Sequence, residues 1–311
     1  MGDMTTERPP VSGPQFEAMM AQIDFKLTQD GVDIPGRSML AVREVSLRYN
    51  LSIPLGGDPA RLPRELAENL ALSNAIKSWY DNVYGDRQKI DVCPGRTIVE
   101  VDGDLYAMRI PRAFGSARYV VGRNWLDTPD ITRGPATRNV VQLLEDMTPA
   151  KAARLSAMAL DSIAAAFETA LPASYTLENT SHDLMRIARG DVDVAVGSLM
   201  VRHGRYGESK WASLQAAEKI FKAAIELAGG NYTFTHVLAE LDKMLVATGL
   251  VFDVRAQIGA IQCQPAIRYG KESCTREEAL AAHHASLEMV NILRDAGAKF
   301  ELGIGGMRRS P

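Results

Sequence analysis

Cysteine is scarce in this chain, which has three in 311 residues. Cys93, Cys263 and Cys274 form no CxxC pair, no histidine stands at ligand spacing from them, and their number is odd. These features exclude a disulfide framework and a cysteine-based zinc site, because both need paired or closely spaced thiols. The three residues are predicted to be reduced thiols of a cytoplasmic protein that carries no metal and no cofactor.

The chain also lacks a strong charge of one sign and a long apolar run. Lys and Arg number 35 against 38 Asp and Glu, and the net charge of −3 argues against wholesale coating of nucleic acid. No apolar run reaches the roughly 18 residues that a membrane helix needs, and no signal segment opens the sequence, so no membrane partner is predicted. Neither an HExxH nor a G-x-S-x-G pattern occurs, which leaves zinc and serine hydrolases of those classes without support.

What is present is the composition of a folded protein, 46% hydrophobic and 23% charged, with a length typical of about two domains. The polar, Pro-rich segment 1–14 is predicted to be a disordered tail. The segment 15–171 is predicted to be an α+β domain of no recognised family. Its first helix begins near Arg61, with Pro63 in the first turn, and stops at Gly85.

The strands of this domain carry the clearest local signal. Two β-rich runs, Thr97–Val101 and Leu105–Ile110, are joined by Asp102-Gly103, a dipeptide typical of hairpin turns. A third strand is expected over Tyr119–Val121. A long helix is expected from Thr148, its cap, to Ala170, and the segment Leu171–Tyr175 is predicted to be the linker to the second domain.

The second part, 176–301, reads as helical throughout and is followed by a flexible tail over 302–311. Capping boxes are predicted at Thr180–Asp183 and at Thr275–Glu278. Helix ends are predicted at three glycines, Gly204, Gly229 and Gly249. The connections are short, so neighbouring helices are expected to pack antiparallel.

An ordered set of segments in this part resembles the HEPN family. The set consists of the helix HDLMRIARGDVDVAVGSLM, the turn Gly204-Arg205-Tyr206, the QAAEK-x-x-KA helix from Gln215, Thr235-His236-x-Leu238, Arg268-Tyr269 and a last helix over Thr275–Gly297. The resemblance covers about residues 182–300. It implies an all-α bundle of four or five helices that often forms homodimers. It also implies either a metal-independent ribonuclease or a non-catalytic module that binds nucleotides or partner proteins.

Ribonucleases of this family use an Arg followed after four to six residues by a His. Arg255 lies in the corresponding region, but no His follows it, so the resemblance does not extend to this catalytic pair there. The spacing occurs later as Arg276 and His283, on one face of the last helix. His283 shares the apolar face of that helix, which favours a packing residue over a catalytic one, whereas His284 is predicted to point outward.

The best binding candidate is a polar stripe formed by Gln215, Glu218, Lys219 and Lys222, which share one helix face at spacings i, i+3, i+4 and i+7. Its lysines could bind an anion, or the stripe could form an intramolecular network that orients the helices. Arg268 and Tyr269 would extend the site or simply end the fourth helix. The HEPN resemblance implies that His236 faces the bundle in a structural role.

A second candidate surface lies in the first part. Between Arg96 and Arg138 stand seven arginines and no lysine, against five acidic residues. Arginine favours bidentate phosphate contacts. The candidates on or beside the hairpin are Arg96, Arg109, Arg112, Arg118 and Arg123. A solvated face or an oligomer interface is the alternative interpretation.

Three functions remain from the sequence. The first is a non-catalytic binding and dimerisation module for a nucleotide, a nucleic acid such as RNA, or a protein partner. The second is a HEPN ribonuclease of toxin or phage-defence type that uses Arg276 and His283. The third is a structural assembly protein. A homo-oligomer is expected in each case.

Overall fold

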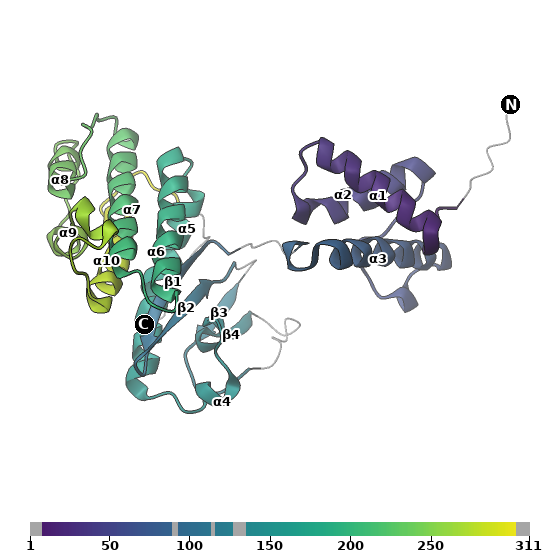
Figure 1. The fold of residues 1–311 in the computed structure, drawn as a ribbon, viewed down its shortest axis with the longest axis horizontal. Coiled ribbons are helices and arrows are strands. Elements are labelled where there is room, and N and C mark those ends of the chain that lie inside the picture. The colour runs from purple at the N-terminus through teal and green to yellow at the C-terminus, as the bar shows by residue number, and fades with distance from the viewer. Residues whose placement is uncertain (1–7, 89–92, 113–115, 127–134, 303–311) are drawn as a thin grey trace. The chain divides into compact units, whose positions relative to one another are not determined.

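The computed structural model describes residues 8–88, 93–112, 116–126 and 135–302. Over these residues the chain is mostly helical, 62% in ten α-helices, with two small β-sheets. The chain divides into two compact units, Met1–Val92 and Cys93–Pro311 (Figure 1). None of the helices in the described ranges is long and apolar enough to span a membrane.

The first unit is helical over its described residues. It contains α1 (Gly13–Gln29), α2 (Ile34–Tyr49), α3 (Arg64–Tyr84) and the short 3₁₀ turns Pro59–Arg61 and Gly85–Gln88. Their buried faces form a core of their own, with Met20, Val45 and Ile76 at its centre. Gly85 ends α3 with φ 52°, a conformation that favours glycine, so the predicted stop is confirmed.

The predicted N-terminal tail is only partly described. Residues 1–7 lie outside the described residues, and α1 already begins at Gly13, inside the segment predicted to be disordered. Arg8 pairs with Glu68 at 2.7 Å. At the other end, all of the predicted tail except Leu302 lies outside the described residues.

A two-stranded antiparallel hairpin opens the second unit. Strands β1 (Gly95–Val101) and β2 (Asp104–Ile110) pair in register, with Val101 opposite Asp104. Asp102 and Gly103 have φ values of 49° and 92°, so the predicted turn is confirmed. The expected third strand is β3 (Ala117–Val120). It does not join the hairpin but pairs in parallel with β4 (Ala136–Asn139), which leads into the 3₁₀ turn Val140–Leu143.

The predicted linker is part of a buried helix. Instead of one helix over 148–170, the chain forms α4 (Pro149–Ala152), capped by Thr148 as predicted, and then α5 (Ala157–Asn179), capped by Ser156. Leu171, Ala173 and Tyr175 are buried in α5, and Pro172 lies inside it. A proline removes one hydrogen bond from a helix, but the apolar face of α5 continues beyond it and keeps the helix packed.

The sequence suggested that the hairpin belongs to a separate α+β domain. The structure shows that it does not. An isolated hairpin is marginal in water because it cannot bury one face alone. Here Val99, Val101 and Ile110 enter the same core as residues of the helices that follow. The observed boundary lies at 92/93 rather than at 171–176.

The remaining helices complete this unit. They are α6 (Asp183–Met200), α7 (Tyr206–Leu227), α8 (Leu238–Val246), α9 (Arg255–Ile261), the 3₁₀ turn η5 (Pro265–Tyr269) and α10 (Arg276–Asp295). Helix α7 packs against α6, α8, α9 and α10, and Figure 1 shows α6 and α7 side by side. Phe221 and Ile220 of α7 are fully buried in the shared core.

The two predicted capping boxes have different outcomes. The box at Thr275 is confirmed, since its hydroxyl accepts from the Glu278 amide while the Glu278 carboxylate accepts from the Thr275 amide. The box at Thr180 is wrong. Thr180 ends α5, with its hydroxyl bonded to the Thr176 carbonyl, and His182 caps α6 by accepting from the Leu184 amide. Helix α5 runs without a break up to the residue before Thr180, so Thr180 ends α5 instead of beginning α6.

Candidate functional site

The polar stripe of α7 contains a buried ion pair. Lys222 Nζ lies 2.5 Å from Glu218 Oε1, and the two residues are 7% and 6% exposed. They stand one helical turn apart, so the helix itself sets their approach. Burying two charges is unfavourable unless each finds a partner, so this pair strongly restricts what can replace either residue.

The Glu218 carboxylate is shared with two further groups. Nδ1 of His236 lies 2.6 Å from its Oε2, and Gln215 Nε2 donates to the same oxygen at 3.3 Å. His236 comes from the loop before α8, and its side chain is 62% exposed. His236 contacts the bundle through the buried Glu218 carboxylate, as the resemblance implies, but most of its side chain is exposed. This residue links the buried pair to the surface.

The fourth member of the stripe, Lys219, points to the neighbouring helix. Its Nζ lies 2.7 Å from Asp191 Oδ2 of α6 and donates to the Gln215 carbonyl at 3.3 Å. Burial raises the pKa of Asp191, while Lys219 opposes this shift. Both lysines of the stripe thus have carboxylate partners inside the chain. The intramolecular network that the sequence left open is present, and the structure shows no uncompensated cation within the stripe.

Aromatic rings surround the exposed edge of this network. The Lys222 ammonium lies 5.2 Å from the ring centre of Tyr232 and 5.9 Å from that of Phe234, within reach of cation–π attraction. The ring of Trp211 lies 6.1 Å from that of His236. Phe234 is 101% exposed, whereas Tyr232 and Trp211 are half-buried. We call Gln215, Glu218, Lys222, Trp211, Tyr232, Phe234 and His236 the α7 site.

Arg268 and Tyr269 do not extend the α7 site. They lie in η5, which packs against the beginning of α7, where a Cβ at Gly207 would collide with the Ile267 carbonyl oxygen. Gly207 precedes Glu218 by three helical turns, about 16 Å at 1.5 Å per residue. Both side chains are exposed, and the Arg268 guanidinium lies 5.9 Å from the Tyr269 ring. They form a separate surface feature.

The arginines around the hairpin are mostly engaged within the chain. Arg96 pairs with Glu145 at 2.7 Å, Arg112 pairs with Glu178, and Arg123 donates to the Leu155 carbonyl. Arg109 also has a partner. Arg118 is exposed on β3. Because these arginines have partners within the chain, the contacts favour a structural role for them over phosphate binding.

The histidine of the alternative catalytic pair is not accessible to solvent, and the arginine is only partly exposed. His283 is fully buried on α10, as its predicted place on the apolar face required, and its Nε2 lies 3.0 Å from the Thr97 hydroxyl of β1. Arg276 pairs with Glu100 at 2.8 Å and donates to the Gly103 carbonyl. The prediction that His284 points outward is wrong. Its Nε2 lies 2.7 Å from the Ile98 carbonyl oxygen, because β1 packs against that face of α10.

Acid is expected to destabilise the protein through His283. Burial lowers the pKa of His283 to about 3 from its ordinary 6.5, with a smaller contribution from His284. Below pH 6.5 the unfolded chain therefore binds a proton at His283, whereas the folded chain does not. The free energy of unfolding should fall by about 1.4 kcal/mol per pH unit as pH drops from 6.5 toward the folded pKa. Urea titrations at several pH values, followed by circular dichroism, measure this slope.

The matched control for that slope is His283→Gln, which keeps an uncharged hydrogen-bonding side chain without a titration. The free energy of unfolding of the variant should depend on pH less steeply than that of the wild type, by the contribution of one bound proton. Equal slopes for the two proteins would show that His283 binds its proton as readily in the folded chain as in the unfolded one.

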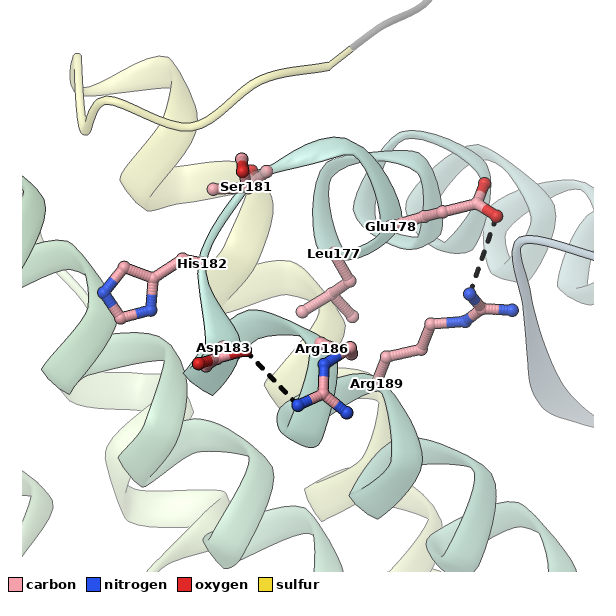
Figure 2. Close-up of a pocket in the computed structure, with 8 residues that line it drawn as sticks. Leu177, Glu178, Ser181, His182, Asp183, Arg186 and Arg189 are labelled. Atoms are coloured by element: carbon pink, nitrogen blue, oxygen red, sulfur yellow. Dashed lines mark hydrogen bonds and ion pairs between the residues drawn. The ribbon is translucent and has the colours of Figure 1, made fainter. Parts of the chain in front are cut away.

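A pocket of about 510 Å³ lies where α5 meets α6. Figure 2 shows Arg189 reaching toward Glu178 and Arg186 toward Asp183 across it. Arg189 also donates to the Cys93 carbonyl. His182 Nε2 lies 2.8 Å from Glu226 of α7. Each arginine of this pocket has a carboxylate partner, so the pocket offers weaker support for an anion than its two arginines alone suggest.

Two members of the α7 site, Tyr232 and Phe234, had no signal in the sequence, because they reach it from an irregular loop that no spacing rule connects to α7. Trp211 could have been found, since it lies four residues before Gln215 on the same helix face. Within the ranges that the structure covers, no group of three or more His, Cys, Asp or Glu side chains is arranged to hold a metal ion.

The α7 site must be interpreted from its own geometry. No known protein family, curated protein or solved structure matches this chain. The arrangement of its helices supports the coarse expectation of a helical bundle, while the HEPN resemblance continues to rest on the quoted residues. A buried ion pair with an exposed histidine and an exposed aromatic ring is the feature from which a function can be argued.

Proposed function

We propose that this chain is a non-catalytic binding and dimerisation module of the HEPN type, and that a protein partner binds at the α7 site. The observation that carries the proposal is the continuity of the site from interior to surface. The buried Glu218–Lys222 pair reaches the surface at two places, through His236 beside Glu218 and through the fully exposed ring of Phe234 near Lys222.

Such a site is well suited to recognition. The buried pair fixes the positions of His236 and the aromatic loop, so the exposed groups are held in place before a partner arrives. An aromatic ring without intramolecular cover contributes most when a partner removes it from water. Residues of these types dominate the energetic centres of protein interfaces.

The charges favour a protein over a polyphosphate. Lys219 and Lys222 already hold carboxylates of the same chain, so neither is available to a phosphate without breaking a buried or half-buried pair. Affinity for a nucleic-acid backbone depends on cations that can displace counterions. A single nucleotide base stacked on Phe234 or Trp211 is the second candidate, supported by the exposed ring alone.

The Phe234→Ser/His236→Ala double variant tests the proposal. Native mass spectrometry of the purified full-length wild type should detect a bound protein at defined stoichiometry, and the double variant should lose it about tenfold or more. The unfolding free energy should change by less than about 1 kcal/mol, because both side chains are mostly exposed. Val251→Ser is the matched control, since Val251 is 89% exposed outside the site.

Other outcomes point elsewhere. If the wild type instead binds a nucleotide and the double variant loses it, the α7 site stands but its partner is a nucleotide and not a protein. Binding that survives the double variant would remove the α7 site from the proposal. Metal-independent cleavage of RNA that disappears in both Arg276→Ala and His283→Ala would replace the binding module with the ribonuclease.

A further inference from the structure

A pocket that the proposed function does not use lies between α5, α10 and β1. Its volume is about 290 Å³. Its floor is apolar and buried, since Val99, Ala166 and Leu287 are exposed by 2%, 7% and 1%. The three elements pack against one another and contribute these residues to the core of the second unit. The pocket is therefore part of the folded structure and does not depend on the arrangement of a loop.

Short side chains on α5 keep the pocket open. Four of them line it at spacings i, i+3, i+4 and i+7, which place them on one face of the helix. They are Ser162, Ala165, Ala166 and Thr169. A side chain as large as leucine at these positions would take up much of the volume. The face that α5 turns to this pocket thus leaves room for a small molecule.

The two side chains of the pocket with a permanent charge are both acidic. Glu100 of β1 and Glu288 of α10 line it, whereas no Lys or Arg is among the described residues that do. Glu100 pairs with Arg276, which lies outside the lining, at 2.8 Å. Glu288 accepts a hydrogen bond from the neutral amide of Gln257 at 3.1 Å, and no ion pair of the described residues compensates its charge. The electrostatic field of the pocket therefore favours a cation and repels an anion.

The uncharged polar groups of the pocket can accept hydrogen bonds as well. Nε2 of His284 lies 2.7 Å from the Ile98 carbonyl oxygen, which can only accept, so Nε2 carries the hydrogen of the neutral ring. Nδ1 then keeps its lone pair, and no described residue donates to it. The hydroxyls of Ser162 and Thr169 can accept too. A ligand that matches this lining must bring the hydrogen-bond donors itself.

We propose that the pocket between α5, α10 and β1 binds a small organic cation that carries a primary ammonium group on an apolar body. An ammonium group has three donors and no acceptor, so it matches the carboxylate of Glu288 and the neighbouring acceptors. The apolar body packs against Val99, Ala166 and Leu287. This site shares no residue with the α7 site, so the proposal goes beyond the binding of a protein partner there.

Three probes of similar size test the class of ligand. Phenethylamine carries the cation, 3-phenylpropan-1-ol is neutral and 3-phenylpropionate is an anion. Saturation-transfer NMR titrations of the full-length protein should give a dissociation constant of about 0.1 to 1 mM for the amine, as is usual for a ligand this small. The alcohol should bind about fivefold more weakly or worse, and the carboxylate should show no binding. No binding of the amine at about 10 mM, well above the expected range, would overturn the proposal, as would an alcohol or a carboxylate that binds as tightly as the amine.

Two variants locate the ligand. Glu288→Gln removes the charge at nearly unchanged shape and should weaken binding of phenethylamine about fivefold or more. Ala165→Leu, at an exposed position on the rim of the pocket, should abolish it by filling the space. The matched controls are Glu277→Gln and Ala281→Leu, because both residues are exposed on α10 and neither lines the pocket. Circular dichroism should show all four variants folded. Unchanged affinity in both pocket variants would place the amine elsewhere and overturn the proposal.

The double variant of the α7 site separates this pocket from the exposed aromatic ring there. Phe234→Ser/His236→Ala should bind phenethylamine as tightly as the wild type does, because neither residue lines the pocket. Loss of the amine in this variant would show that it stacks on Phe234, and the proposal for the pocket would fail. The partner of the α7 site is measured with the same protein by native mass spectrometry, so either proposal can fail without the other.

Discussion

Glu218→Ala is expected to lower the free energy of unfolding by about 3 to 5 kcal/mol, the range observed when one member of a buried ion pair is removed. The substitution leaves the Lys222 ammonium, 7% exposed, without a carboxylate 2.5 Å away. It also removes the acceptor of His236 and Gln215. Chemical denaturation of the purified variant, monitored by far-ultraviolet circular dichroism, measures the change.

Glu226→Ala supplies the matched control. Glu226 also lies on α7 and also pairs with a histidine, His182, but its side chain is 45% exposed. Its loss should change the unfolding free energy by less than about 1 kcal/mol, as for surface ion pairs. A Glu218→Ala effect as small as that of Glu226→Ala would show that water reaches Lys222 and that the pair is not buried in solution.

The double variant Glu218→Met/Lys222→Met separates the two parts of this effect. Replacing both charges by apolar side chains of similar length removes the unpaired charge, so most of the stability should return. The α7 site should nevertheless lose its partner, because His236 has no acceptor to hold it. The double variant would then keep most of the stability of the wild type but lose the binding of the partner.

His283→Ala is expected to destabilise the fold by about 2 to 4 kcal/mol. The substitution opens a cavity at a position with no exposed surface and leaves the buried Thr97 hydroxyl without its 3.0 Å partner. A catalytic residue would behave differently, since its loss removes activity while the stability hardly falls. Thermal and urea unfolding together with an RNA cleavage assay distinguish the two roles.

His284→Ala serves as its control on the same helix. His284 also bonds to β1, through the Ile98 carbonyl, but it is only half-buried. Its removal should lower the unfolding free energy by about 1 kcal/mol, since water can satisfy the carbonyl. A His283→Ala protein as stable as the wild type would contradict the packing role.

Local signals predicted the elements that depend on few residues. The Asp102-Gly103 turn, the stop at Gly85 and the capping box at Thr275 all follow from backbone preferences within four positions. Gly229 directly follows the C-cap of α7 with a positive φ, as expected where a helix ends, whereas Gly204 and Gly249 come three and two residues after the C-caps of α6 and α8. The polar stripe of α7 could be identified because one helix carries all of it.

Features that depend on distant segments could not be read in the same way. Leu171–Tyr175 was predicted to be a linker because it contains Pro172, yet burial of the surrounding residues keeps α5 continuous. Helices α1 and α2 were not anticipated within the predicted α+β domain. The orientation of His236 depended on a loop that meets α7 only in the folded chain. Tertiary packing decided each of these cases, and no single segment records it.

The contact of β1 with α10 also affects the order in which the parts of this unit can fold. Thr97–His283 and Ile98–His284 each join residues 186 positions apart. During synthesis the hairpin can close early through its own turn and can pack against α5 and α6, but its contacts with α10 must wait until the last helix has been made. Contacts of such sequence separation slow folding, because the long intervening segment must be ordered before they form. The last helix thus completes the cover of the first strands of this unit.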